Sequence, residues 1–257
     1  MKVNFITSIN SHLFAVLICM VKLLQHIPNG ITLGNLLCGC LAIMLTLKGN
    51  VTDAVLLMGL AAVLDFFDGF FARLLGVSGE MGKQLDSLAD VVSFGVLPGF
   101  LFLHIGKQFL GDESLVPYLS LLIIAFSAYR LGKFNIDTRQ TDHFIGVPTP
   151  ANAMFIGSLI LVLQNDDYGL GTIIREPAFL VVFPLLSAYL LVAEFPLIAL
   201  KFKHFGFKGN EQRFILLLVS VLSVVIFKFA GVTFAIILYV IISYLYYITT
   251  KNKTHEV

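Results

Sequence analysis

The sequence predicts an all-α polytopic membrane protein of about eight transmembrane helices, with a six-helix core and a short N-terminal interfacial helix. Two observations predict this class. Of the 257 residues, 58% are hydrophobic and only 13% are charged, with a mean hydropathy of +0.91, values that are typical of polytopic membrane proteins. The apolar residues also gather into stretches of about the length needed to cross a bilayer, and residues that end helices separate them.

The elements follow in order along the chain. Residues 13–24 are apolar but short and contain Lys22, so we expect a helix that lies along the membrane surface. A signal peptide is the alternative, although no cleavage site of small residues follows. The candidate spans are 31–48, 52–75, 84–106, 114–133, 148–165, 177–200, 210–229 and 231–250. The segments between them carry Gly49-Asn50, Gly76-Val77-Ser78-Gly79, Gly146-Val147-Pro148 and Lys208-Gly209-Asn210, which are helix-ending signals.

The chain is expected to form one membrane domain over residues 1–257, because it has no internal repeat and no long polar linker. Within it, residues 1–27 are the interfacial segment, and residues 201–257 hold the last two spans. The net charge of +1 gives no reason to expect a nucleic-acid partner. The three cysteines and six histidines show no disulfide framework and no zinc-ligand spacing.

Four aspartates stand between strongly apolar flanks. Asp65 and Asp68 are three residues apart and Asp86 and Asp90 are four apart, so each pair shares one face of a helix. A carboxylate in a membrane helix costs about 2.5–3.5 kcal/mol on insertion scales, so four of them need compensating partners. Hard divalent cations prefer oxygen ligands. The spacing therefore predicts that two packed helices face the four carboxylates into one metal-binding cavity.

Small residues and one cation accompany the carboxylates. Gly69, Ala72 and Gly82 let a ligand or a neighbouring helix approach the backbone closely. Arg73 offers a planar donor fork that suits phosphate. Together with bound metal, these residues predict a pocket for a phosphorylated group of about nucleotide size.

The run DFFDGFFARLLGVSGEMGKQLDSLAD at 65–90 resembles the signature of the CDP-alcohol phosphotransferase family, with all eight signature residues present. The resemblance implies an integral membrane enzyme that moves a substituted phosphate group from a CDP-linked donor to an alcohol and releases CMP. It implies that Asp65, Asp68 and Asp86 ligate metal and that Asp90 completes the metal site and acts as general base on the acceptor hydroxyl. Asp86 and Asp90 are the expected catalytic carboxylates. It further implies that the CDP pocket is lined by Gly69, Ala72, Arg73 and Gly82.

The resemblance also places the catalytic core at 28–200 and suggests a homodimer. We expect two divalent cations at the carboxylates, either Mg²⁺ or Mn²⁺. Asn29 follows Pro28 and is a candidate contact of the CDP head. With Thr32, these two residues are also explained by a helix start, where proline and a polar cap are favoured.

Four further segments resemble the phosphatidylserine synthase branch of the family. They are HIPNGITLGNLLCGCLAI at 26–43, DSLADVVSFGVLPGF at 86–100, YRLGKFN at 129–135 and FIGVPTPANA at 144–153. This resemblance implies CDP-diacylglycerol and L-serine as substrates and phosphatidylserine and CMP as products. With the same chemistry, glycerol 3-phosphate or inositol phosphate is the alternative acceptor.

The acceptor pocket needs a group that reads the serine carboxylate. Arg130 is the first candidate because arginine binds carboxylates in a bidentate manner, and Lys133 and Asn135 come after it. Arg139 is better explained by membrane topology or by lipid headgroups. Glu194 belongs to no motif, so we expect an interfacial residue or a buried, paired one.

The basic residues predict the orientation in the membrane. If the N-terminus is cytoplasmic, only four of the 17 lysines and arginines lie outside, namely Lys48, Lys107, Arg175 and Lys228. This positive-inside bias predicts a protein of the cytoplasmic membrane whose aspartate site faces the cytoplasm. A cation transporter is the alternative from another class, because carboxylates inside a membrane also mark ion pathways. That alternative leaves Gly69, Ala72, Arg73 and Gly82 unexplained.

Overall fold

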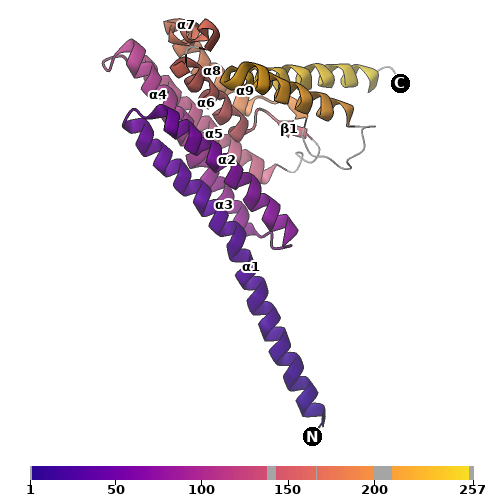
Figure 1. Ribbon diagram of the computed structural model, residues 1–257. Helices are drawn as coiled ribbons and strands as arrows, with labels where there is room; N and C mark the ends of the chain where they lie inside the picture. The colour runs from indigo at the N-terminus through magenta and orange to yellow at the C-terminus, as the bar shows by residue number, and fades with distance from the viewer. Residues whose placement is uncertain (1, 138–142, 166, 199–209, 255–257) are drawn as a thin grey trace.

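The computed structural model describes residues 2–137, 143–165, 167–198 and 210–254. Helices dominate this part of the chain, and two short strands form one antiparallel pair (Figure 1). The helices are α1 (Lys2–Leu47), α2 (Val51–Leu74), α3 (Glu80–Asp90), α4 (Leu97–Leu110), α5 (Leu121–Ile136), α6 (Thr149–Asn165), α7 (Leu170–Arg175), α8 (Pro177–Val192) and α9 (Glu211–Thr254). Shorter elements are a π-helical turn η1 (Val91–Val96), the 3₁₀ turns η2 (Val116–Ser120) and η3 (Asp167–Gly169), and the strands β1 (His143–Ile145) and β2 (Pro196–Ile198).

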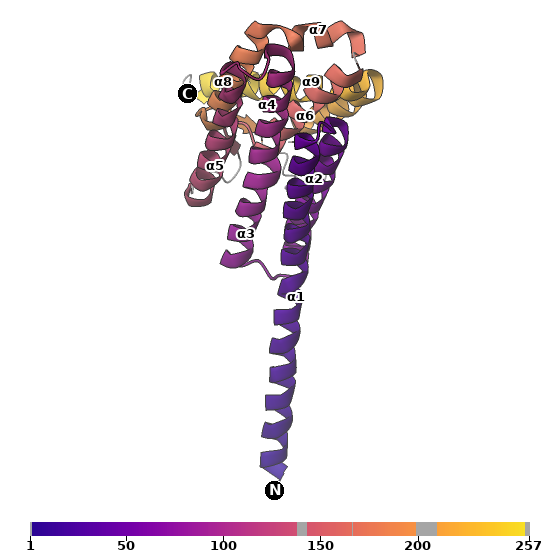
Figure 2. The same cartoon turned by 90° about the vertical axis from the view of Figure 1, so that its left-hand side faces the viewer.

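Helix α1 is continuous from Lys2 to Leu47 and contains Pro28 in its interior. The expectation that Pro28 and Asn29 begin a helix is therefore wrong. Proline removes one backbone donor, but the apolar sequence continues on both sides, and the Thr32 hydroxyl lies 3.0 Å from the Pro28 carbonyl oxygen. The N-terminal part of α1 projects beyond the other helices (Figures 1 and 2). That residues 13–24 lie along the membrane surface stays a prediction.

The all-α polytopic class is confirmed. In the described part of the chain, five helical stretches are long and apolar enough to cross a membrane: His26–Leu47, Val51–Leu74, Glu80–Leu110, Val116–Ile136 and Phe214–Leu245. The stretch from Glu80 to Leu110 joins α3, η1 and α4, and 61% of its apolar window is buried, against 28% or less for the others. This composite helix is therefore the centre of the molecule, and it carries Asp86 and Asp90.

The remaining predicted spans are helical but have different bounds. Helix α6 has 17 residues, and α8 has 16 and ends at Val192 instead of near residue 200. The stretches 210–229 and 231–250 are the two arms of α9, which bends at Lys228 (φ 50°, ψ −121°). The bend is so tight that a Cβ on Gly231 would overlap the Ser223 carbonyl. Both arms run at a steep angle to α1, α2 and α4 (Figures 1 and 2), and α9 packs mainly against α6 and β2. Their crossing of the membrane therefore stays a prediction.

A strand pair ties the start of α6 to the end of α8. Strands β1 and β2 pair antiparallel, and the Gly146 and Val147 amides donate to the carbonyls of Phe195 and Leu190, each at 3.0 Å. Gly146 has φ +73°, and a Cβ there would lie 2.7 Å from the Leu191 carbonyl oxygen. Chain reversal after Val192 is thus stabilised by backbone bonds to the segment that precedes α6.

Replacement of Gly146 by Ala is expected to destabilise this connection. A left-handed backbone costs a non-glycine residue roughly 1–2 kcal/mol, and the close carbonyls add to this cost. Thermal unfolding in detergent should show a lower Tm for Gly146→Ala. Gly132→Ala is the matched control, because a Cβ on Gly132 meets no atom within 4 Å. An unchanged Tm for Gly146→Ala would show that the backbone here accommodates a Cβ at no cost.

Candidate active site

The four aspartates converge as the spacing predicts. Oxygen atoms of Asp65, Asp68 and Asp86 all lie within 4.8 Å of one another. The Asp65 carboxyl is also within hydrogen-bonding reach of both Asp86 and Asp90. Asp68 and Asp90 are nearly buried, with exposed fractions of 5% and 7%. One cluster of four carboxyl groups therefore lies between α2 and the composite helix.

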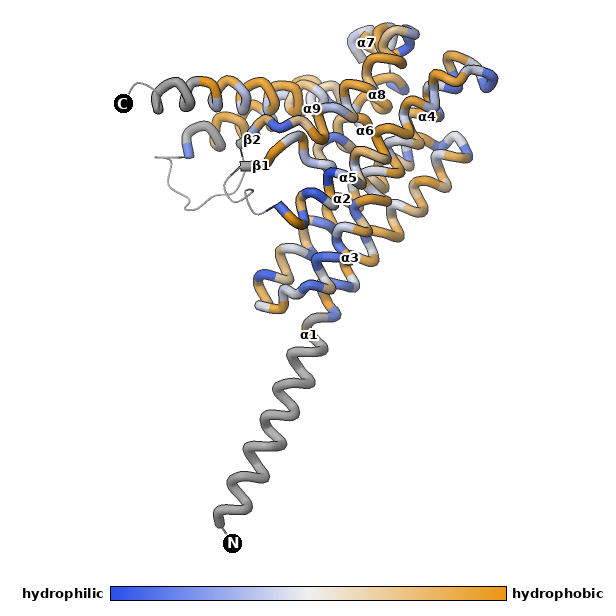
Figure 3. The backbone as a smooth tube through the Cα atoms, turned by 180° about the vertical axis from the view of Figure 1, so that it is seen from behind, coloured by the Kyte–Doolittle hydropathy of each residue, from blue (hydrophilic) through white to orange (hydrophobic). Residues whose placement is uncertain are grey.

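Local sequence explains why the two helices meet in this way. Helix α2 ends at Leu74, and Gly76 turns the chain with φ +64° before α3 begins at Glu80. Hydrophilic stretches of α2 and α3 gather at this end of otherwise hydrophobic helices (Figure 3). The short connection therefore keeps Asp65 and Asp68 next to Asp86 and Asp90.

The carboxylates open onto a cavity of about 730 Å³. The residues expected at the CDP head all line it: Asn29, Gly69, Ala72, Arg73 and Gly82. A Cβ on Gly82 would lie 3.3 Å from the Asn29 Oδ1, and one on Gly69 would lie 3.2 Å from the Arg73 Nη1. These two glycines therefore leave room for the two polar side chains that reach into the cavity.

Helix α1 contributes two polar contacts to the carboxylates. The Thr32 hydroxyl donates to the Asp68 Oδ2 at 2.6 Å, and the Asn35 Nδ2 donates to the Asp90 Oδ1 at 3.4 Å. A capping role alone had explained Thr32 in the sequence, and Asn35 was not among the predicted site residues. A signal was available, because Asn29, Thr32 and Asn35 recur every three residues in an apolar helix, a polar stripe of the kind that faces a polar site.

The donor set fits divalent metal ions. Several carboxylate oxygens within 4.8 Å of one another offer the hard oxygen ligands that Mg²⁺ and Mn²⁺ prefer. Without cations, buried carboxylates at this spacing repel one another strongly. The residues that would hold the metal are Asp65, Asp68, Asp86 and Asp90.

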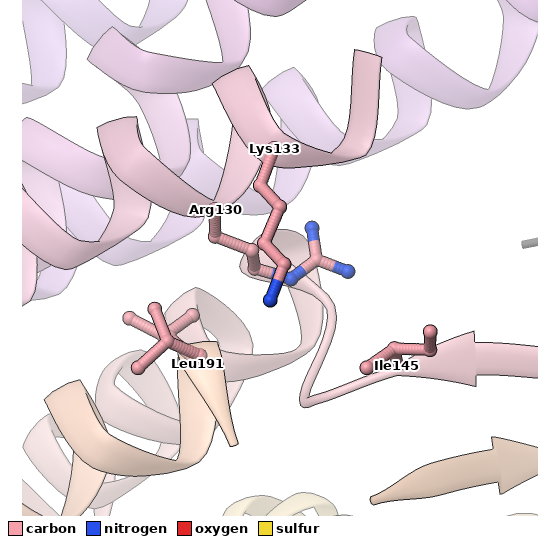
Figure 4. Close-up of a pocket in the computed structure, with 5 residues that line it drawn as sticks. Arg130, Lys133, Ile145 and Leu191 are labelled. Atoms are coloured by element: carbon pink, nitrogen blue, oxygen red, sulfur yellow. The ribbon is translucent and has the colours of Figure 1, made fainter. Parts of the chain in front are cut away.

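Arg130 and Lys133 lie in a second, much smaller pocket of about 10 Å³, also lined by Ile145, Leu191 and Val192. Both side chains run from α5 into the same gap (Figure 4). The structure thus separates these two candidates from the residues that line the carboxylate cavity. Asp90 is nevertheless close enough to Arg130 for electrostatic interaction.

The two cations of this pocket differ in their partners. The Lys133 Nζ forms an ion pair with the Glu194 Oε1 at 2.8 Å. Glu194 is therefore paired, but its side chain is 63% exposed and not buried. Arg130 is buried, with 7% exposed, and its Nη1 donates to the Thr149 hydroxyl at 3.2 Å. Within the described residues, its Nε has no hydrogen-bond partner and no ion pair involves it. Arg139 lies outside the described residues.

Asn135 faces α3. Its Nδ2 donates to the Ser87 hydroxyl at 2.8 Å, and its carbonyl accepts from the Lys83 Nζ at 3.0 Å. Lys83 and the neighbouring Phe134 line the carboxylate cavity. Asn135 therefore connects the end of α5 to the helix that carries Asp86 and Asp90.

Comparison with known proteins agrees with this geometry. Residues 25–200 match the family described as CDP-alcohol phosphatidyltransferase. The chain is 35% identical over 189 residues to CDP-diacylglycerol–serine O-phosphatidyltransferase of Bacillus subtilis, covering 74% of this chain and 96% of the relative. It is 35% identical over 144 residues to the protein of the same name from Helicobacter pylori (55% and 59%) and 36% identical over 138 residues to archaetidylserine synthase of Methanothermobacter thermautotrophicus (52% and 58%). The chain belongs to the CDP-alcohol phosphatidyltransferase family.

Proposed function

We propose that this protein transfers the phosphatidyl group of CDP-diacylglycerol to the hydroxyl of L-serine and forms phosphatidylserine and CMP. The observation that carries the proposal is the convergence of four signature carboxylates on one cavity that all five expected CDP-head residues line. Serine as acceptor is supported by the names of the relatives from Bacillus subtilis and Helicobacter pylori. The proposal includes a site that faces the cytoplasm from the cytoplasmic membrane, and a homodimer.

Two divalent cations, Mg²⁺ or Mn²⁺, are part of the proposal. Four carboxylates carry a charge of −4 when ionised, which two divalent ions balance. Bound at Asp65, Asp68, Asp86 and Asp90, such ions would neutralise the pyrophosphate of the donor and the charge on the departing CMP.

The protein's own residues position the reactants and move one proton. Asn29 and Arg73 reach into the cavity beside the glycines and hold the CDP head. Asp90 accepts the proton of the serine hydroxyl while the serine oxygen bonds to the lipid-side phosphorus. The bond from that phosphorus to the bridging oxygen breaks, and CMP leaves with its electron pair.

Arg130 is the proposed reader of the serine carboxylate. A buried charge without a partner is unfavourable, and Arg130 is a buried guanidinium with no ion pair among the described residues. Asp90 interacts with Arg130 electrostatically but forms no salt bridge with it, so an anionic substrate group would supply a direct ion-pair partner. Lys133 already has Glu194 at 2.8 Å, so its contribution to serine binding is secondary.

Asn135 is proposed to act through Ser87 and not by direct contact with serine. Ser87→Ala and Asn135→Ala should each raise the KM for serine roughly 3–10-fold, since a typical hydrogen bond contributes about 0.5–1.5 kcal/mol. The double variant should be no worse than the more impaired single variant, because both changes remove the same 2.8 Å bond. Steady-state kinetics of the four proteins measures this coupling. Effects that multiply would instead indicate a direct contact between Asn135 and the substrate.

The proposed function is tested by CMP release from the purified protein with CDP-diacylglycerol and Mn²⁺ or Mg²⁺. Serine, glycerol 3-phosphate and inositol phosphate are added singly. Release that depends on serine is expected. Release with one of the other alcohols alone would keep the carboxylate site but reject the acceptor. No release with any alcohol, from folded protein that binds Mn²⁺, would reject the transferase reaction.

A further inference from the structure

We infer that Asn35 is a positioning residue, which fixes the Asp90 carboxylate by a hydrogen bond from α1. The inference rests on the proposed function, because it gives Asp90 the role of accepting the serine proton. The Asn35 Nδ2 donates to the Asp90 Oδ1 at 3.4 Å. This separation is long, as catalytic hydrogen bonds often are before substrate binds. This bond holds the Asp90 carboxylate in one orientation.

The surroundings of Asn35 argue against a purely structural role. The side chain is completely buried, and among the described residues its Oδ1 has no hydrogen-bond partner. A buried acceptor without a donor costs about 1–3 kcal/mol, so an apolar side chain would pack here at lower cost. The only hydrogen bond of this amide within the described residues is the one to Asp90.

A second buried polar residue on the same helix forms its hydrogen bond within the helix, as is usual for a buried hydroxyl. Thr46 is 1% exposed, and its hydroxyl donates to the Ala42 carbonyl one turn earlier at 2.9 Å. Thr46 therefore satisfies itself within α1. Asn35 instead reaches a residue 55 positions later in the chain.

The backbone of α1 is held against the turn that follows Asp90. The Ser93 hydroxyl donates a hydrogen bond to the backbone carbonyl oxygen of Asn35 at 3.1 Å. A Cβ on Gly39, one turn further along α1, would overlap the Ser93 Oγ. Asn35 and Gly39 thus bring α1 into direct contact with Ser93. This contact sets the distance between the Asn35 side-chain amide and the Asp90 carboxylate.

The experiment uses the full-length protein in detergent with Asn35→Ala and Asn35→Thr. The threonine variant copies the arrangement of Thr46, since its hydroxyl can donate to the carbonyl four residues earlier, but it is too short to reach Asp90. Thr46→Ala is the matched control, because it removes a buried polar group of α1 that lies about 16 Å along the helix from Asn35. Three quantities are measured: kcat at saturating Mn²⁺, the KM for serine, and the Kd for Mn²⁺ without substrate.

We expect both Asn35 variants to lower kcat about 10–100-fold, the range for residues that orient metal ligands, with the KM for serine within twofold. The Kd for Mn²⁺, read by electron paramagnetic resonance, should rise in the same variants and stay unchanged in Thr46→Ala. An Asn35→Thr enzyme with kcat and Kd within twofold of wild type would overturn the inference. So would a loss of activity that matches the loss of folded protein. If the wild type releases no CMP, the proposed function fails, and the Mn²⁺ isotherms alone then decide whether Asn35 orients Asp90.

Discussion

Replacement of Asp90 by Asn is expected to abolish serine-dependent CMP release. General-base assistance contributes typically about 10²–10⁴-fold, so kcat should fall by at least this factor. The amide retains the size of the carboxylate but cannot accept the serine proton as a base. CDP-diacylglycerol should still bind, because Asn29, Arg73 and the glycines of the cavity are unchanged.

Asp112→Asn is the matched control for this change. Asp112 undergoes the same chemical substitution, but its side chain is 84% exposed and lies 3.6 Å from Lys107 in a surface ion pair. The two variants are compared by CMP release and by binding of a labelled donor. Near-normal turnover of Asp90→Asn would show that another group removes the serine proton.

Replacement of Arg130 by Met is expected to raise the KM for serine about 10²-fold or more, since truncating one partner of a buried charge pair costs about 2–5 kcal/mol. Methionine keeps an unbranched apolar stem but removes the guanidinium. The KM for CDP-diacylglycerol should change little. Arg130→Lys should give an intermediate result, because a lysine lacks the planar donor fork. Steady-state kinetics with each substrate varied in turn measures these effects.

Two controls test this assignment: the Lys133→Met variant, and ethanolamine as an acceptor in place of serine. Lys133 lines the same pocket but is paired with Glu194, so its loss should affect the KM for serine less than the loss of Arg130. Ethanolamine carries the hydroxyl and ammonium of serine without its carboxylate. Wild-type enzyme should strongly prefer serine over ethanolamine, and Arg130→Met should lose most of that preference. Equal preference in the two enzymes would mean that Arg130 does not contact the carboxylate.

The carboxylate cluster could be predicted from the sequence because its geometry is local. Spacings of three and four residues place each aspartate pair on one helix face, and the short turn at Gly76 keeps α2 next to α3. The cavity residues Gly69, Ala72, Arg73 and Gly82 lie in the same stretch of chain. Their position at the cavity therefore follows from the packing of α2 against α3. Asn29 comes from α1, and its approach is made possible by Gly82.

Contacts between distant segments could not be read in this way. The Lys133–Glu194 pair joins residues 61 positions apart, and the Asn35–Asp90 bond joins residues 55 apart. In neither pair does a local sequence pattern identify which distant residue the side chain contacts. The prediction that a helix begins at Pro28 was wrong for a related reason, since a proline weakens a helix at one bond while the apolar sequence on both sides continues it. The end of α8 was misplaced because the pairing of β1 with β2 lies outside any helical periodicity.

The π-helical turn after Asp90 constrains how many residues the composite helix can contain. A π-turn is equivalent to one residue inserted into an α-helix. Within η1, Ser93 is bonded to the backbone carbonyl of Asn35 in α1, and Gly95, two residues later, is packed against Ser127 of α5. Deletion of one residue from η1 would leave a regular helix of the same hydrophobicity, but it would rotate the half that holds the carboxylates by about 100° against the half anchored in the core. Homologues in this family should therefore tolerate substitutions in this segment far better than insertions or deletions of a single residue.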